Sequence, residues 1–142
     1  AFIEWALLNT GVAAFCKISE TRHDFVRLRY VKDNGMPAFY SPDFLVRTAD
    51  AIYLAETKAQ DQTSHPNVQR KRKAAAAWCE RINTLPPELR SDLPWHYALV
   101  GESIFHDWRQ NGARLGELLA YSKVRAVATA QSQGDLALGD GF

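Results

Sequence analysis

Two apolar runs separated by a short polar turn constrain the fold of this chain more than any other feature. Residues 41–47 and 51–58 are rich in aromatic and branched residues, and Thr48, Ala49 and Asp50 lie between them. Runs of this kind bounded by polar turn residues predict two antiparallel strands joined by a tight turn. The density of apolar residues also indicates strands that are buried on both faces of a sheet.

The predicted register brings two of the few charged residues of these runs together. A hairpin centred between residues 49 and 50 places Asp43 opposite Glu56, because the two lie equally far from the centre. Directly opposed residues have Cβ atoms about 4.5–5.5 Å apart, and like charges at that distance repel. A divalent cation between them reverses this effect, since hard cations bind carboxylate oxygens. A bulge in either strand would shift the register by one residue.

Lys58 adds an ammonium group to the predicted pair of carboxylates. It follows Glu56 by two positions and therefore projects from the same face of the strand. A Pro-Asp dipeptide and a Glu-x-Lys tripeptide each occur often by chance, so neither is informative alone. Charges do not belong in buried strands unless they are paired or bind a metal. The combination of Asp43, Glu56 and Lys58 therefore predicts a site for a metal and a reactive water.

The composition is that of an ordinary soluble globular domain. The chain has 142 residues, of which 46% are hydrophobic and 23% charged, with a net charge of +1. No run of about 18 apolar residues occurs, so no membrane span is expected. Cys16 and Cys79 lie far apart, and the histidines are scattered, so no zinc-binding spacing is present. The cysteines are expected to be buried free thiols in a reducing cytoplasm.

The two ends of the sequence suggest a fragment of a longer polypeptide. The chain begins with Ala1 rather than Met, and residues 1–8 look like the interior of a helix without a capping residue. Residues 131–142 are rich in Gly, Asp, Ala and Ser and show no periodicity, which is typical of a mobile segment. We expect one domain over residues 1–128 and a flexible tail over residues 129–142.

Periodicity and turn signals predict an α/β domain. The expected elements, in chain order, are two short helices within residues 1–18, a strand over 25–31, a turn at 33–35, the hairpin strands, a helix over 67–85, a strand over 95–100 and a helix over 105–127 interrupted near 111. The strand over 25–31 and the hairpin would form a three-stranded antiparallel meander. Asn67 is a plausible N-cap of the following helix. This order predicts a central mixed sheet covered by helices on both faces.

A basic run follows the predicted hairpin. It consists of Arg70, Lys71, Arg72 and Lys73. Such runs more often solvate a helix face than bind a ligand, but the proximity to the candidate metal site favours contact with nucleic acid. Helical spacing turns Lys71 toward the core. Its ammonium group then needs the acidic site or a phosphate as a partner, unless its stem packs while the charge reaches water.

The order of these elements resembles the PD-(D/E)xK nuclease superfamily, whose motif lies on one hairpin of an αβββαβ core. The segments YSPDFLVRTADAIYLAETKAQ, KRKAAAAWCERIN and WHYALVGE are similar to the C-terminal endonuclease domain of the restriction subunit of type III restriction enzymes. The resemblance covers residues 1–105. It implies a restriction-endonuclease-like fold and an Mg²⁺-dependent endodeoxyribonuclease that hydrolyses phosphodiester bonds.

The resemblance also implies roles for individual residues. Asp43 and Glu56 would ligate Mg²⁺, for which Mn²⁺ can substitute, and the backbone carbonyl of Thr57 would complete the protein ligands. Lys58 would orient or help deprotonate the attacking water. Many members carry a further Glu on the first helix, and Glu4 is the candidate here. The alternative is that Glu4 simply points to solvent.

Contacts with DNA and with partner proteins follow from the same resemblance. Gln60 would contact phosphate or water, and the basic run at residues 70–73 would neutralise the backbone of double-stranded DNA. The expected partners are a helicase domain of the same parent chain and a modification subunit that recognises the sequence, because the chain shows no base-reading motif. Two other possibilities stay open. One is a catalytically silent nuclease-fold module that binds DNA or supports assembly, and the other is a plain interaction domain of a helicase.

Overall fold

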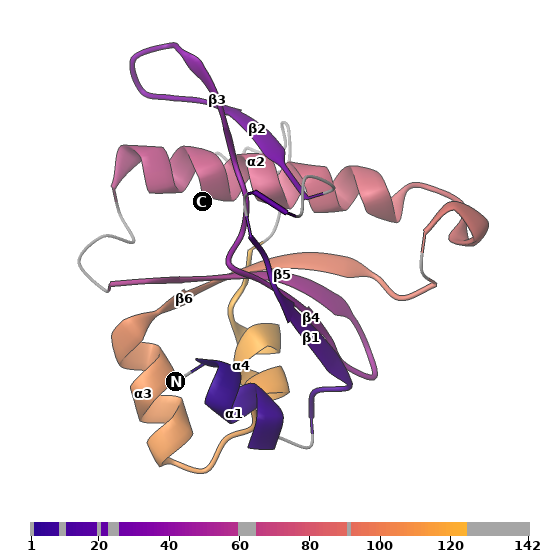
Figure 1. Ribbon diagram of the computed structural model, residues 1–142, viewed down its shortest axis with the longest axis vertical. Coiled ribbons are helices and arrows are strands. Elements are labelled where there is room, and N and C mark those ends of the chain that lie inside the picture. Colours follow the sequence, from indigo (N-terminus) through magenta and orange to yellow (C-terminus); the bar gives the residue numbers. More distant parts are fainter. Residues whose placement is uncertain are drawn as a thin grey trace, which may run out of the picture.

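The protein is a mixed α/β domain built on one central sheet (Figure 1). The computed structural model describes residues 2–8, 11–19, 21–22, 26–59, 65–90 and 92–124. In chain order the elements are α1 (Phe2–Leu8), β1 (Ala14–Lys17), β2 (Leu28–Val31), β3 (Pro37–Tyr40), β4 (Phe44–Arg47), β5 (Ile52–Lys58), α2 (Pro66–Asn83), the 3-10 helix η2 (Pro87–Leu89), β6 (Trp95–Gly101), α3 (Glu102–Gln110), α4 (Leu115–Tyr121) and β7 (Lys123–Val124).

The main sheet has five strands in the order β1-β4-β5-β6-β7. All neighbouring strands are antiparallel except β5 and β6, which run parallel. Parallel neighbours need a crossover connection, and α2 supplies it. Strands β2 and β3 form a separate two-stranded hairpin inserted between β1 and β4. Without that insertion, the order α1-β1-β4-β5-α2-β6 is the expected αβββαβ core, so the predicted fold class is confirmed.

Each face of the sheet is covered by its own layer (Figure 1). On one face, α1, α3 and α4 pack against side chains such as Phe44, Val46 and Ala55. On the other face, α2 and the β2–β3 hairpin pack against Leu54 and Tyr97. Because successive side chains of a strand point to opposite faces, β5 contributes to both cores. Its position in the middle of the sheet buries Leu54 and Ala55 completely.

The β4–β5 hairpin has the predicted register. Phe44 pairs with Ala55 and Arg47 with Ile52, which centres the hairpin between residues 49 and 50. The turn is held by Thr48, whose amide donates to the carbonyl of Ala51 over 2.9 Å. Its hydroxyl oxygen accepts from the amides of Asp50 and Ala51. A Ser or Thr hydroxyl that bonds the backbone of a turn in this way stabilises it locally.

The first part of the chain differs from the prediction. The expected second helix within residues 12–18 is wrong, because Ala14–Lys17 form β1 and pair with β4. The strand predicted over 25–31 is observed at Leu28–Val31, and it pairs with β3 rather than with β4. Strand β1 therefore completes the meander. Local apolar density suited a helix, but the open edge of β4 offered a full ladder of hydrogen bonds to an extended segment.

The remaining differences concern helix ends and the strands β3 and β7, which were not predicted. Strand β7 falls within the helix expected over residues 105–127. The N-cap of α2 is His65 rather than Asn67, and its Nδ1 accepts from the amide of Asn67 over 3.1 Å. The last predicted helix is two helices, α3 and α4, with the predicted break at Asn111 and Gly112. Gly112 has φ +80, a value that favours glycine. The boundary between residues 128 and 129 and the predicted tail lie outside the described residues.

Candidate active site

Asp43 lies immediately before β4 and is fixed at the end of the hairpin. Its carbonyl accepts the amide of Ile18 over 2.9 Å, which extends the β1–β4 pairing. Its carboxylate Oδ2 accepts from the backbone amide of Thr57 over 3.0 Å and from the Thr57 hydroxyl over 3.4 Å. The side chain of Asp43 is therefore held against the last residues of β5, and the observed register extended by one pair places Asp43 opposite Glu56.

Glu56 is a carboxylate buried in β5 with 4% of its surface exposed. The hydroxyl of Tyr97 donates to its Oε1 over 2.7 Å. The Nζ of Lys58 lies 3.3 Å from its Oε2. A buried charge is tolerated when it is paired and hydrogen-bonded. Both oxygens of Glu56 thus have a partner, one from the adjacent strand β6 and one from the same strand.

Tyr97 is a site residue that the sequence interpretation missed. It is 1% exposed, so its hydroxyl must find a partner inside the protein. Burial raises the pKa of Tyr97 well above its ordinary value, and the charges of Glu56 and, more weakly, Asp43 raise it further. The hydroxyl therefore stays protonated and donates. The signal in the sequence was a hydroxyl-bearing side chain in the middle of the largely apolar strand WHYALV.

Tyr40 lies next to this group and extends it toward α2. Its hydroxyl donates to the backbone carbonyl of Lys71 over 2.9 Å. Burial, followed by the charge of Glu56, raises the pKa of Tyr40. Two neutral tyrosine hydroxyls therefore lie near the Glu56 carboxylate, and one of them connects the region to the helix that carries the basic run.

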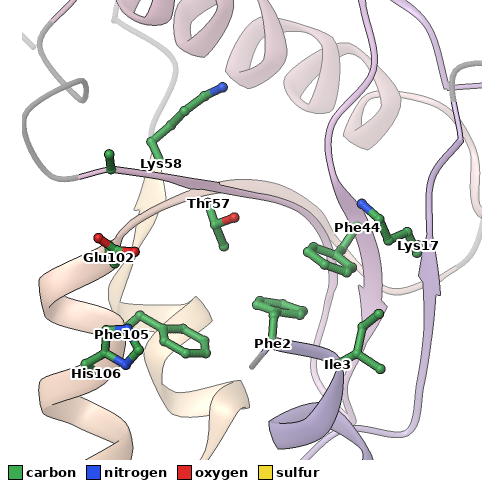
Figure 2. A pocket seen from close by; sticks show the side chains of 10 residues that line it. Phe2, Ile3, Lys17, Phe44, Thr57, Lys58, Glu102, Phe105 and His106 are labelled. Carbon is green, nitrogen blue, oxygen red and sulfur yellow. The ribbon is translucent and has the colours of Figure 1, made fainter.

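A cavity of about 400 Å³ lies at the same end of the sheet but on the opposite face. Phe2, Phe44 and Phe105 form its apolar wall, and Lys17, Thr57 and His106 are among its polar lining residues. Figure 2 shows Thr57 directed into this space, whereas Lys58 points away from it toward the helix above. Glu56 and Lys58 therefore face α2 and the β2–β3 hairpin, whereas Thr57 faces the cavity. Because Thr57 and Lys58 are both among the residues that line it, the cavity borders the predicted site.

The structure does not place Glu4 beside Asp43, Glu56 and Lys58. Helix α1 packs on the face of the sheet opposite the side chains of Glu56 and Lys58. The Glu4 carboxylate is exposed and pairs with Arg109 of α3, whose Nη2 lies 2.7 Å from Glu4 Oε1. The hydrogen bond to Arg109 and its charge lower the pKa of Glu4. This agrees with the solvent-facing alternative for Glu4.

The basic run on α2 does not face one direction. Arg70 and Lys73 are exposed, and the guanidinium of Arg72 donates to Gln69 over 3.0 Å. Lys71 turns inward as expected, but its Nζ lies over the rings of Tyr30 and Tyr40 at 5.6 and 5.3 Å. Aromatic faces attract cations, so these rings supply the partner that this lysine needed. Gln60 lies outside the described residues.

The donor groups near Asp43 and Glu56 fit a hard cation only in part. Among the described residues, no three His, Cys, Asp or Glu side chains are close enough to form a metal site. Two carboxylates and one ammonium nevertheless leave a negative charge at this point. Mg²⁺ is commonly bound through one or two carboxylates together with water and substrate phosphates. Asp43 and Glu56 have the chemistry of such a pair.

Comparison with protein-family models indicates a nuclease. Residues 16–84 match the family model of the TnsA-like endonuclease N-terminal domain, and this segment contains the whole β4–β5 hairpin and α2. No curated protein and no solved structure matches the chain. No helix in the described part is long and apolar enough to cross a membrane. Over residues 16–84 the chain is therefore similar to TnsA-like endonucleases, members of the restriction-endonuclease-like PD-(D/E)xK superfamily, and this similarity suggests a nuclease.

Proposed function

We propose that the protein is a metal-dependent DNA endonuclease domain whose active site consists of Asp43, Glu56 and Lys58. The observation that carries the proposal is the register of the β4–β5 hairpin, which brings the two carboxylates to neighbouring positions. The Nζ of Lys58 lies 3.3 Å from Glu56 on the same face. A carboxylate pair beside a lysine suits the hydrolysis of a phosphodiester.

Asp43 and Glu56 would hold Mg²⁺ or Mn²⁺, with the backbone carbonyl of Thr57 as a further ligand. A bound divalent ion polarises a phosphoryl oxygen and lowers the pKa of coordinated water. The hydrogen bonds from Thr57 to Asp43 and from Tyr97 to Glu56 orient the two carboxylates before any ion binds. Lys58, 27% exposed, is accessible to a water molecule and would position it for attack. Glu4 has no role in this proposal, because Arg109 holds its carboxylate.

Double-stranded DNA is the proposed substrate. Arg70 and Lys73 are exposed near the start of α2 and would neutralise backbone phosphates, while Arg72 would assist from the neighbouring surface. Gln60 would contact a phosphate near the site. Lys71 would act mainly through packing, since its ammonium group lies over two tyrosine rings. Contacts of this kind position a duplex without reading its sequence.

The proposed setting is the cleavage module of a type III restriction enzyme in the cytoplasm. A helicase domain of the same parent chain would deliver the DNA, and a modification subunit would recognise the sequence. This setting is based on the sequence resemblance. The family-model match instead favours a TnsA-like endonuclease, and both readings agree on a nuclease.

The test is cleavage of supercoiled and linear duplex DNA by the full parent chain with Mg²⁺ or Mn²⁺. Asp43→Ala and Lys58→Ala should lower the cleavage rate at least about 100-fold, the usual effect of losing a group that takes part in proton transfer or metal catalysis. Asp50→Ala and Lys123→Ala are matched controls, because both side chains are exposed. Asp50 lies in the turn at the opposite end of the β4–β5 hairpin, and Lys123 lies in β7, which β6 separates from β5. Both variants should cut at the wild-type rate.

Equal cleavage by wild type, Asp43→Ala and Lys58→Ala would contradict the assignment of the active site to these residues. A silent nuclease-fold module predicts a different pattern, in which the parent chain shows no metal-dependent cleavage although DNA binding persists. Calorimetry with Mn²⁺ tests separately whether Asp43 is a ligand of the metal ion. Binding that survives Asp43→Ala would show that the ion is held elsewhere.

A further inference from the structure

The outward face of the β2–β3 hairpin is exposed among the described residues. Val26, Leu28, Tyr30 and Tyr40 point inward and are buried against α2. The alternate residues point outward, and they include Arg27, Arg29 and Phe39. Phe39 leaves 64% of its surface exposed and Val31 leaves 49%. Exposed apolar side chains gathered on one face commonly mark an interaction site.

The strand register places arginine and apolar side chains together on this face. Arg29 pairs with Phe39 across the hairpin, and Val31 pairs with Pro37. Opposed residues of an antiparallel pair present their side chains to the same face. Within the described part of the chain, neither Arg27 nor Arg29 has an ion-pair partner. Arg29 in β2 and Arg27 just before it thus expose two guanidinium groups beside an aromatic ring, neither of them ion-paired with another described residue.

The hairpin is hydrogen-bonded to the first turns of α2. The amide of Asp33, in the turn, donates to Oδ1 of Asn67 over 3.1 Å. The hydroxyl of Tyr40 donates to the carbonyl of Lys71 over 2.9 Å, and the Lys71 ammonium packs on Tyr30 and Tyr40. Figure 1 shows the turn of the hairpin standing out beyond α2. The projecting hairpin is therefore anchored to the helix that also carries the exposed Arg70 and Lys73.

The hairpin also leads directly into the candidate active site. Strand β3 ends at Tyr40, and only Ser41 and Pro42 separate it from Asp43. A molecule held by the hairpin is therefore held close to the carboxylates. For a nuclease, that molecule is the substrate.

We propose that the outward face of β2–β3, centred on Arg29 and Phe39 and extended by Arg27 just before β2, is a contact surface for duplex DNA. This inference rests on the proposed nuclease function and adds a substrate-binding surface to it. Two-stranded ribbons fit the major groove of B-DNA, and arginine is the side chain best suited to phosphate contacts. A second copy of the chain is a poorer occupant, because a symmetric contact would bring the arginines of both copies together. An acidic polyanion complements them.

The experiment measures binding of the full chain to a fluorescently labelled 30-base-pair duplex at several salt concentrations, in EDTA so that no cleavage occurs. The double variant Arg27→Ala/Arg29→Ala should weaken binding about 10-fold or more and reduce the salt slope by about two, one for each lost phosphate contact. Phe39→Ser should weaken binding without changing the slope. Arg47→Ala/Arg81→Ala is the matched control, since it also removes two exposed arginines.

The outcomes separate this surface from the catalytic site. Binding by the double variant equal to that of the control variant overturns the inference, as does failure of the wild-type chain to bind the duplex. A dimer that becomes monomeric in Phe39→Ser with unchanged DNA binding also overturns it and assigns the face to a second copy. Unimpaired cleavage by Asp43→Ala would overturn the catalytic assignment while leaving the binding result intact.

Discussion

Glu56 is the residue whose environment most clearly departs from that of an ordinary strand position. Its neighbours Leu54 and Ala55 are apolar and fully buried, yet Glu56 keeps a carboxylate in the same interior. The ion pair with Lys58 and the hydrogen bond from Tyr97 stabilise the charge. An apolar residue of similar size would need neither partner. The arrangement is therefore better explained by chemistry at this position than by stability.

Tyr97→Phe tests whether the hydroxyl orients Glu56. Removing it leaves Oε1 of a buried carboxylate without its donor, which should lower the free energy of unfolding by about 1–3 kcal/mol in urea denaturation. Loss of a group that orients a ligand should also lower Mn²⁺ affinity about 10-fold or more by calorimetry. Tyr121→Phe is the control, because Tyr121 is 67% exposed. Lower stability with unchanged Mn²⁺ affinity would reduce Tyr97 to a packing role.

Glu4→Gln tests the alternative that Glu4 ligates the metal. We expect an unchanged cleavage rate, because Glu4 is exposed and paired with Arg109 on the other face of the sheet. Since Arg109 lowers the pKa of Glu4 below 4.5, the pair stabilises the fold above that pH and loses its effect as the pH falls through the lower value. Melting curves of both proteins should therefore coincide at strongly acidic pH. A cleavage defect as large as that of Asp43→Ala would restore Glu4 to the site.

Among the elements, the β2–β3 hairpin depends most on a single backbone conformation. Gly35 has φ +86 in its turn, and a Cβ added there would meet no atom within 4 Å. The cost of Gly35→Ala is therefore conformational and should be about 1–2 kcal/mol in denaturant unfolding. Gly112→Ala is a matched control in the α3–α4 turn, with φ +80 and equally open space.

The two glycine variants should differ in DNA binding. Both should lose similar stability, but Gly35→Ala alone should weaken binding to a 30-base-pair duplex, because only its turn belongs to the β2–β3 hairpin. Equal affinities, measured by fluorescence anisotropy in EDTA, would argue against a contribution of the hairpin tip.

The elements also show which parts of the structure the sequence could predict. The β4–β5 hairpin was predictable to the register because Thr48 and its neighbours fix the turn and the apolar pattern is local. Strand β1 could not be predicted in this way, because Ala14–Lys17 become extended only by pairing with β4, which lies far along the chain. The position of Tyr97 at the candidate site could not be predicted for the same reason. Its hydroxyl reaches Glu56 only after α2 returns the chain to the sheet as a parallel strand.

At the scale of the whole molecule, two cores share one sheet. Leu118 of α4 is fully buried in the core beneath the sheet, and Leu28 of β2 is 1% exposed in the core above it. Strand β5 supplies Ala55 to the first core and Leu54 to the second. Loosening either layer therefore removes support from the same central strands, and we expect the domain to unfold as one unit.

Leu28→Ala and Leu118→Ala test this coupling. Each creates a cavity in one core and should lower the free energy of unfolding by about 2–5 kcal/mol. Because both layers unfold together, each variant should keep a single transition with the wild-type dependence on urea concentration. Leu8→Ala, at a position 76% exposed, should change little. A second transition in Leu28→Ala alone would mean that the layer of α2 and the β2–β3 hairpin unfolds separately. That layer carries the proposed DNA surface, so its independence would uncouple substrate binding from the stability of the rest of the domain.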